Sequence, residues 1–224
     1  QLYSQHPDHS AFFIDFYSKP GDLILDCFAG RGTNLLVGAA LGRRVVGYDL
    51  THQNLEKVRS VALEHTDIEP EDLVLHHSDG CDLVEYEGQE NIFDLVTIDP
   101  PYLGGAERYT DDERCLGNIR NNDQFLERLE LCMTNLKRLV KPSNWEQKIF
   151  HPIVIKTGSA RRGKEGLIDM ATEVEFIARK LDLVLHDKVM NILNSHWGLF
   201  NVRRCIEYRY GVKKHETNLV FLKY

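Results

Sequence analysis

Short apolar runs alternate with helical patterns along most of this chain, and this alternation restricts its fold more than any other feature. Turn or cap residues separate each run from the helical pattern that follows. The predicted strands are residues 23–25, 44–48, 72–76, 93–98 and 152–156. The predicted helices are residues 10–17, two helices capped by Thr33 and Thr51, and residues 123–139 and 172–180. This order predicts an α/β fold in which helices cover both faces of a parallel sheet.

The end of the chain departs from this alternation. Residues 183–185, 203–210 and 218–222 are successive apolar runs with little helical pattern between them. They predict an antiparallel finish at one edge of the sheet. A chain of 224 residues with 42% hydrophobic content can bury one good core, but it is short for two generous domains. We therefore expect a single domain over residues 1–224.

Composition limits the kinds of partner and compartment. The net charge of -7 is unusual for an enzyme that acts on nucleic acid, because Lys and Arg normally neutralise the phosphates. Local basic residues would have to do so, and the first candidates are Arg161, Arg162 and Lys164 in one loop. The five cysteines are scattered and never spaced as Cys-x-x-Cys, which argues against a disulfide framework and a zinc cluster. We expect no metal, no membrane span, and a cytoplasmic protein, or a nuclear one in a eukaryote.

Residues that follow the predicted strands indicate a ligand site, because ligands of such sheets bind beyond the carboxyl ends of the strands. After the first strand, Gly30 and Gly32 let the backbone turn and approach a ligand closely. Asp49 comes directly after the second strand and about twenty residues past the glycine turn, at the position where nucleoside-binding sheets hold a ribose. Asp79 follows the third strand. Each acid alone is more often a cap or a solvated carboxylate, but matching strand ends in order favour a nucleoside site.

The most specific pattern is Asp99-Pro100-Pro101-Tyr102, directly after the fourth strand. The two prolines fix the backbone and remove two donors, so that carbonyl groups point at a ligand without competing amides. A carboxylate and a carbonyl are both acceptors and can hold the two hydrogens of an aromatic amine. Held in this way, the nitrogen is directed to attack a methyl sulfonium, and Tyr102 offers a face on which an extruded base can stack. A rigid turn at a sheet edge is the structural alternative.

In combination, these segments resemble the DNA amino-methyltransferases that act on adenine or cytosine. Residues 19–33, KPGDLILDCFAGRGT, are similar to the cofactor motif of that family, and residues 41–49 to the segment after it. Residues 99–102 match its catalytic tetrapeptide in full. Cys27 stands where the family usually has Pro, and Arg31 where it usually has Ser. The resemblance implies a Rossmann-like fold with about seven mostly parallel strands.

The resemblance also implies S-adenosylmethionine as cofactor and assigns residues to the site. The segment that starts at His6-Pro7 is similar to the helix that closes over the methionine end of the cofactor. Asp99, Pro100, Pro101 and Tyr102 would bind the target base, and an Asp at the first position is commoner in adenine enzymes. This favours N6 methylation of adenine in DNA. The candidate cofactor-binding residues are Asp26, Phe28, Gly30, Gly32, Thr33, Asp49, Leu50, Asp79 and Gly80.

Other readings remain open. The chemistry could be N4 methylation of cytosine in DNA, or methylation of guanine N2 or adenine N6 in RNA. A catalytically silent binding subunit is disfavoured because the chain keeps both the glycine turn and the tetrapeptide. No segment is large enough to be the family's target-recognition domain, and residues 103–122 and 158–166 are the loops at the catalytic edge. Sequence specificity would then come from a further part of the polypeptide, a partner subunit or a homodimer.

Overall fold

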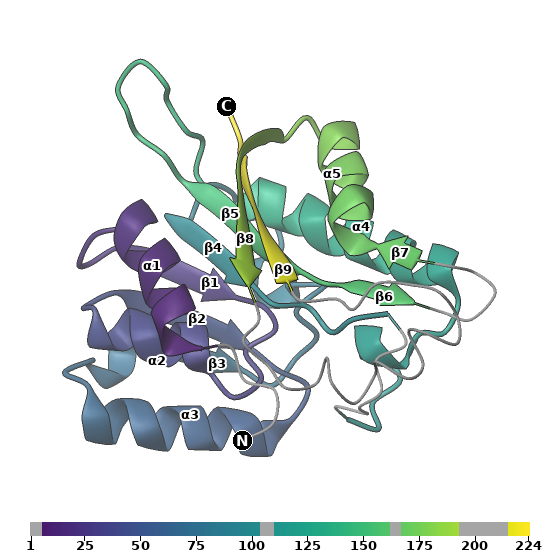
Figure 1. Ribbon diagram of the computed structural model, residues 1–224. Coiled ribbons are helices and arrows are strands. Elements are labelled where there is room, and N and C mark those ends of the chain that lie inside the picture. The colour runs from purple at the N-terminus through teal and green to yellow at the C-terminus, as the bar shows by residue number, and fades with distance from the viewer. Residues whose placement is uncertain (1–5, 104–109, 162–166, 193–214) are drawn as a thin grey trace.

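A computed structural model describes residues 6–103, 110–161, 167–192 and 215–224, and its centre is a seven-stranded sheet with the order β3-β2-β1-β4-β5-β9-β8 (Figure 1). Neighbouring strands from β3 to β5 pair in parallel, whereas β9 is antiparallel to both β5 and β8. The expected parallel sheet with an antiparallel C-terminal edge is confirmed. Its strands are β1 (Leu23–Asp26), β2 (Arg44–Tyr48), β3 (Leu73–His76), β4 (Leu95–Ile98), β5 (Pro152–Thr157), β8 (Val184–Ile192) and β9 (His215–Leu222).

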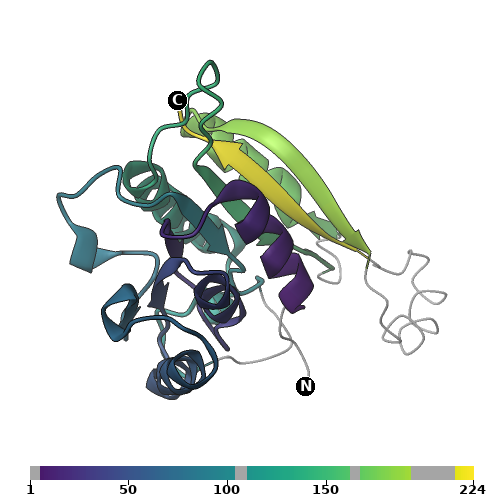
Figure 2. The same ribbon diagram turned by 90° about the vertical axis from the view of Figure 1, so that its left-hand side faces the viewer.

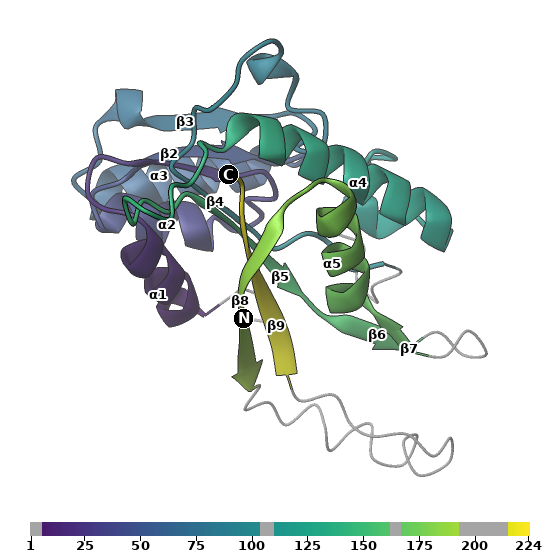
Figure 3. The ribbon, with the colours of Figure 1, turned by 90° about the horizontal axis from the view of Figure 1, so that it is seen from above.

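Helices cover both faces of the sheet, and each face has its own core. Figure 3 shows α4 and α5 on one face and α1, α2 and α3 on the other. Successive residues of a strand point to opposite faces, so Ile24 packs under α1 and α2 while Leu25 packs under α4 and α5. This is why the strands are apolar at nearly every position. The helices are α1 (Pro7–Tyr17), α2 (Thr33–Ala40), α3 (His52–His65), α4 (Asn122–Leu139) and α5 (Met170–Lys180).

Helix starts differ from the sequence prediction most clearly at α2 and α1, while α4 and α5 begin one and two residues earlier than predicted. Thr33 was expected to cap α2, but the N-cap is Gly32 and Thr33 is the first helical residue. The backbone at Gly32 has φ +80, a conformation that glycine adopts far more easily than threonine. The first helix begins at Pro7, three residues before the predicted start, because His6 caps it and proline suits a first helical position. Thr51 is the N-cap of α3, as predicted, although its side chain makes no capping hydrogen bond.

Several strand boundaries differ from the prediction: β8 extends seven residues beyond the predicted run at 183–185, and β9 begins three residues before the predicted run at 218–222. Asp72 ends the short 3-10 helix η1 (Pro70–Asp72) instead of starting a strand, and Phe93 makes an isolated bridge with Val140 ahead of β4. A small hairpin of β6 (Ser159–Arg161) and β7 (Leu167–Asp169) has no counterpart in the prediction. The strand predicted over residues 203–210 lies outside the described residues. None of the described helices is long and apolar enough to cross a membrane.

Two further sets of contacts link elements around the sheet. Figure 2 shows β8 and β9 running together along one side of the molecule with α1 beside them, where Asn191 of β8 meets His9 of α1. The connection from β4 to α4 contains a 3-10 helix, η3 (Leu116–Asn118). Asn118 ties this connection together by donating to the carbonyl oxygens of Thr110 and Asp112. These two hydrogen bonds hold residues 110–118 of the connection together.

Candidate active site

The carboxyl ends of β1, β2 and β4 bring three aspartates to one edge of the sheet. Asp26 ends β1, Asp49 follows β2 and Asp99 follows β4. Because β2, β1 and β4 are neighbours in the sheet, residues that are far apart in sequence meet here. Burial raises the pKa of all three carboxyl groups above the ordinary value of an aspartate. Each of the three carboxyl groups is thus easier to protonate than an exposed aspartate, and a cation or hydrogen-bond donor beside it would favour its ionised form.

Asp49 holds the glycine turn in place. Its Oδ2 accepts a hydrogen bond from the backbone N–H of Gly30 at 2.7 Å, and its Oδ1 accepts from the N–H of Thr51 at 2.7 Å. The side chain of Asn54 donates to the same Oδ1 at 3.2 Å. Each carboxylate oxygen has two lone pairs, so Oδ2 retains an acceptor site for a hydroxyl donor.

The three glycines of the site have different roles. Gly30 has φ +51, and an added Cβ would meet only the Phe28 carbonyl oxygen at 3.9 Å, so the space beside it is open. At Gly32 a Cβ would approach Val58 to 2.3 Å, which makes this glycine a packing requirement of α3. At Gly80 a Cβ would lie 1.9 Å from the Cys27 carbonyl oxygen. The turns after β1 and β3 are therefore in backbone contact, and the open cradle is at Gly30.

A buried chain of hydrogen bonds connects α1 to the glycine turn. The Ser10 hydroxyl donates to Oδ1 of Asn34 at 2.7 Å, and Nδ2 of Asn34 donates to Oδ2 of Asp26 at 2.9 Å. The N–H of Phe28 donates to the other oxygen of Asp26 at 2.9 Å. Burial raises the pKa of Asp26 to about 7, and these two hydrogen bonds oppose the rise. The ionisation of Asp26 is thus poised near neutral pH.

Asp79 is engaged by an arginine of α4. Nη2 of Arg128 lies 2.6 Å from Oδ2 of Asp79, and Nη1 lies 2.8 Å from Oδ1 of Asp82. The N–H of Cys81 donates to Oδ1 of Asp79. The carboxylate is buried and already holds two donors, so it keeps fewer acceptor positions than the sequence implied. Its contact with a cofactor adenine stays a prediction.

Asp99 lies in a polar cluster formed by three elements. Nζ of Lys156, at the end of β5, lies 2.9 Å from Oδ2 of Asp99 and 3.1 Å from Oε2 of Glu216 on β9. The Tyr102 hydroxyl donates to Oε1 of Glu216 at 3.2 Å and to Oδ1 of Asp99 at 3.4 Å. The Asp99 side chain stays 30% exposed, whereas that of Lys156 is 10% exposed. The Asp99 carboxylate is therefore accessible to a ligand, whereas the Lys156 ammonium that pairs with it is enclosed.

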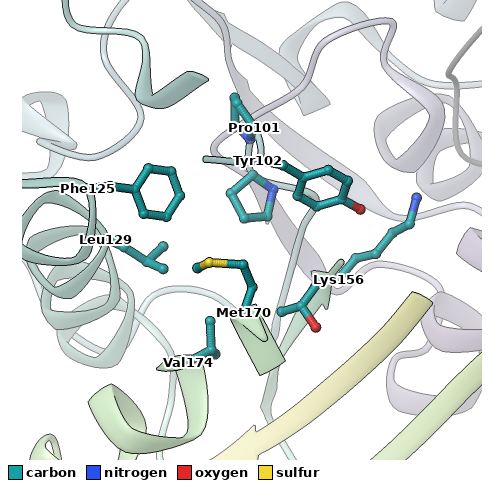
Figure 4. A pocket seen from close by; sticks show the side chains of 9 residues that line it. Pro101, Tyr102, Phe125, Leu129, Lys156, Met170 and Val174 are labelled. Atoms are coloured by element: carbon teal, nitrogen blue, oxygen red, sulfur yellow. The ribbon is translucent and has the colours of Figure 1, made fainter. Parts of the chain in front are cut away.

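A small apolar hollow lies beneath the tetrapeptide. Pro100, Pro101 and Tyr102 form one wall and side chains of α4 and α5 form the other, among them Phe125 and Met170 (Figure 4). The Tyr102 hydroxyl and the Lys156 ammonium lie on the same side of this hollow (Figure 4). Its volume of about 10 Å³ is room for roughly one water molecule. A nucleobase therefore does not fit inside it in this arrangement.

Comparison with known proteins gives matches of two kinds. A family model described as DNA methylase matches residues 10–60, the segment from α1 through the glycine turn and Asp49 into α3. The type II methyltransferase M.MthZI of Methanothermobacter thermautotrophicus is 40% identical over 47 residues, which are 21% of this chain and 13% of that protein. The resemblance to DNA amino-methyltransferases is confirmed. The matched part of this chain spans less than a fifth of the length of that curated relative.

Solved structures extend the likeness in fold to the whole chain. TrmN from Thermus thermophilus has a TM-score of 0.61 at 16% identity, over 100% of this chain and 50% of its own. A geranyl diphosphate methyltransferase in complex with SAM has a TM-score of 0.63 at 15% identity, over 97% of this chain and 85% of its own. At such identities the likeness shows the fold alone. The Rossmann-like methyltransferase fold is confirmed.

Several polar residues of the candidate site were not predicted from the sequence, namely Ser10, Asn34, Arg128, Lys156 and Glu216. One signal was present for Lys156, because it is a charged residue at the end of an apolar strand, where ligand residues gather. Glu216 had no such signal, because its position depends on an antiparallel pairing that spans residues far apart in sequence. Asn34 looked like an ordinary residue in the first turn of a helix.

Some predicted site residues have weaker support than others. Leu50 directly follows Asp49 in the chain, and its carbonyl oxygen is 3.0 Å from Nε2 of His77. Arg161 is the last residue of β6, while Arg162 and Lys164 lie outside the described residues. The contact of these three residues with nucleic acid stays a prediction. Within the described residues, no group of three or more potential metal ligands comes together.

Replacing Arg128 tests the ion-pair network on α4. Arg128→Met should lower the free energy of unfolding by about 1–3 kcal/mol, because it leaves two carboxylates without their cation and Asp79 is buried. Lys180→Met removes an exposed pair with Glu130 and should cost less than about 1 kcal/mol. Urea unfolding at pH 7 measures both. Equal losses for the two variants would contradict the importance of the Arg128 network.

Proposed function

We propose that this protein transfers a methyl group from S-adenosylmethionine to an exocyclic amino nitrogen of a nucleobase in DNA, with adenine N6 as the favoured target. The observation that carries the proposal is that Asp99 and the Pro100 carbonyl stand at the same sheet edge as the glycine turn and Asp49. The match of residues 10–60 to the DNA methylase family supports the substrate class. The Asp at the first position of the tetrapeptide favours adenine over cytosine.

The residues at this edge fit S-adenosylmethionine. Gly30 leaves open space that a side chain would fill, and Asp49 keeps an acceptor site suited to a ribose hydroxyl. The three carboxylates with raised pKa values favour a ligand that carries sulfonium and ammonium charges. When bound, the cofactor supplies an electrophilic methyl carbon whose bond to sulfur breaks with the electron pair left on sulfur.

The tetrapeptide would hold and activate the target amine. Oδ1 or Oδ2 of Asp99 and the Pro100 carbonyl oxygen accept the two N–H hydrogens, which directs the nitrogen lone pair away from the ring and toward the methyl donor. Tyr102 offers its ring to an extruded base. Because the hollow beneath is too small for a base, stacking would take place on the solvent side of Tyr102. After transfer, the nitrogen loses one proton, which the ionised Asp99 can accept.

A direct assay separates the substrate classes. Purified genomic DNA and total RNA are incubated in parallel with labelled S-adenosylmethionine, and the products are digested to nucleosides. Label in N6-methyl-2′-deoxyadenosine from DNA is the expected result, whereas N4-methyl-2′-deoxycytidine would move the proposal to cytosine. Label in RNA alone would contradict the DNA proposal. We propose a further part of the polypeptide, a specificity partner or a homodimer as the source of sequence preference, and sizing by light scattering tests the dimer.

The elevated pKa of Asp26 predicts a pH dependence of cofactor binding. A cationic ligand nearby favours the ionised carboxylate, so affinity should fall as pH is lowered below about 7, by at most about tenfold per pH unit. Isothermal titration calorimetry between pH 5.5 and 7 measures this dependence. Asp26→Asn should bind more weakly at pH 7 but with a flatter profile. An identical slope for both proteins would show that another group is responsible.

A further inference from the structure

The polar cluster around Asp99 contains two charged side chains from outside the tetrapeptide. A single cation, Lys156, is shared between two carboxylates, those of Asp99 and Glu216. The three side chains together therefore carry a net charge of about -1 when all are ionised. Lys156 is buried, and a buried ammonium persists only when it is paired and hydrogen-bonded. Asp99 therefore lies beside one positive side chain, which favours its ionised form, and one negative side chain, which opposes it.

We propose that Lys156 and Glu216 are positioning residues that set the ionisation of Asp99, and with it the pH at which the site accepts a target amine. This inference rests on the proposed function. Lys156 favours the ionised form through a contact of 2.9 Å, and Glu216 opposes it through its own negative charge. Lys156 lies on β5 and Glu216 on β9, so side chains from two strands jointly control the residue that directly follows a third strand, β4.

The ionisation state matters because only a carboxylate offers acceptors on both oxygens. A protonated carboxyl group carries an O–H donor, which would face the N–H hydrogens of the amine and compete with them. Burial raises the pKa of Asp99, and Lys156 partly opposes that rise. Without Lys156, a larger fraction of Asp99 would be protonated near neutral pH. Lys156 itself stays charged, because the two carboxylates outweigh the effect of burial and raise its pKa.

Two further titratable groups, Tyr102 and Asp26, act on Asp99. Tyr102, from the connection after β4, donates a hydrogen bond that lowers the pKa of Asp99. Asp26, on the neighbouring strand β1, is coupled to Asp99 by like-charge repulsion. Among the described residues, Lys156 is the cation that contacts Asp99, so its removal is the most informative change.

The test compares pH profiles of methyl transfer for three variants and one control. Lys156→Met should move the acidic limb of the kcat profile upward by about 1–3 pH units, with activity lost on the acidic side of the shifted limb and recovered at higher pH. Glu216→Gln should move the limb downward, and Lys156→Arg should restore most of the wild-type profile. The control Lys188→Met, on the adjacent strand β8, removes an ion pair with Glu175 of α5 and should leave the limb in place.

A second readout needs no cofactor and no activity. Carbon-13 labelling of aspartate carboxyl groups, with Asp99→Asn to identify the resonance, gives the titration midpoint of Asp99 by NMR. The midpoint should rise in Lys156→Met and fall in Glu216→Gln. Unchanged midpoints, or shifts of both variants in the same direction, would overturn the inference. If Lys156→Met does not fold, Glu216→Gln and Lys156→Arg still decide the matter, and a wild-type protein that fails to methylate DNA would instead refute the proposed function.

Discussion

Asp99→Ala is expected to reduce turnover by about 10²–10⁴-fold while leaving the affinity for S-adenosylmethionine within about threefold of wild type. The substitution removes an acceptor that the proposal assigns to the target amine and not to the cofactor. A loss of kcat and kcat/KM by equal factors is the signature of an interaction made in the transition state. Single-turnover kinetics and calorimetric titration measure the two properties separately.

Two controls accompany this variant. Asp67→Ala changes an exposed aspartate in the turn between α3 and β3 and should leave both turnover and affinity unchanged. Thermal unfolding of Asp99→Ala checks that the cluster around Lys156 still folds. If turnover and cofactor affinity decreased by similar factors, Asp99 would belong to the cofactor pocket, and the assignment of the tetrapeptide to the base would be wrong.

Gly30→Val is expected to have the opposite effect, with loss of cofactor binding by at least about 100-fold, equivalent to roughly 3 kcal/mol. The valine side chain would fill the open space beside the glycine turn, where the proposal places the cofactor. Glycine is also needed for the backbone, because φ is +51 and a branched residue there costs about 1–2 kcal/mol. Stability and binding therefore have to be measured together.

Gly88→Val is the matched control for this backbone cost. Gly88 has φ +74 with open space around it, and it lies in an exposed turn after the 3-10 helix η2 (Val84–Tyr86). Both variants should lose similar stability in thermal unfolding, but only Gly30→Val should lose the heat of S-adenosylmethionine binding in calorimetry. Affinity in Gly30→Val within threefold of wild type would place the cofactor elsewhere.

The sequence predicted the parts of the fold that depend on local pattern. Strands such as β1 and β5 are buried on both faces, so continuous apolar runs mark them clearly. Helix starts were harder, because whether Gly32 or Thr33 caps α2 depends on the backbone conformation of the turn. The β6–β7 hairpin was not predicted, since its strands are only three residues long and carry little periodicity.

The same distinction between local sequence pattern and tertiary packing applies to the candidate site. Asp49 and Asp99 were predictable because each follows its strand directly, and the order of strands in a doubly wound sheet brings such positions together. Arg128 and Glu216 were not, because a helix partner and an antiparallel register decide which side chains they meet. The engagement of Asp79 by Arg128 likewise depends on tertiary packing between α4 and the loop after β3.

The most direct test of the central claim is a crystal structure with S-adenosylhomocysteine and a short DNA duplex that contains the methylated sequence. The account predicts an extruded base on Tyr102, with its amino nitrogen within hydrogen-bond distance of Asp99 and the Pro100 carbonyl, on the side that faces the cofactor sulfur. An Asp99 that remained bound to Lys156 alone, turned away from both base and cofactor, would contradict it.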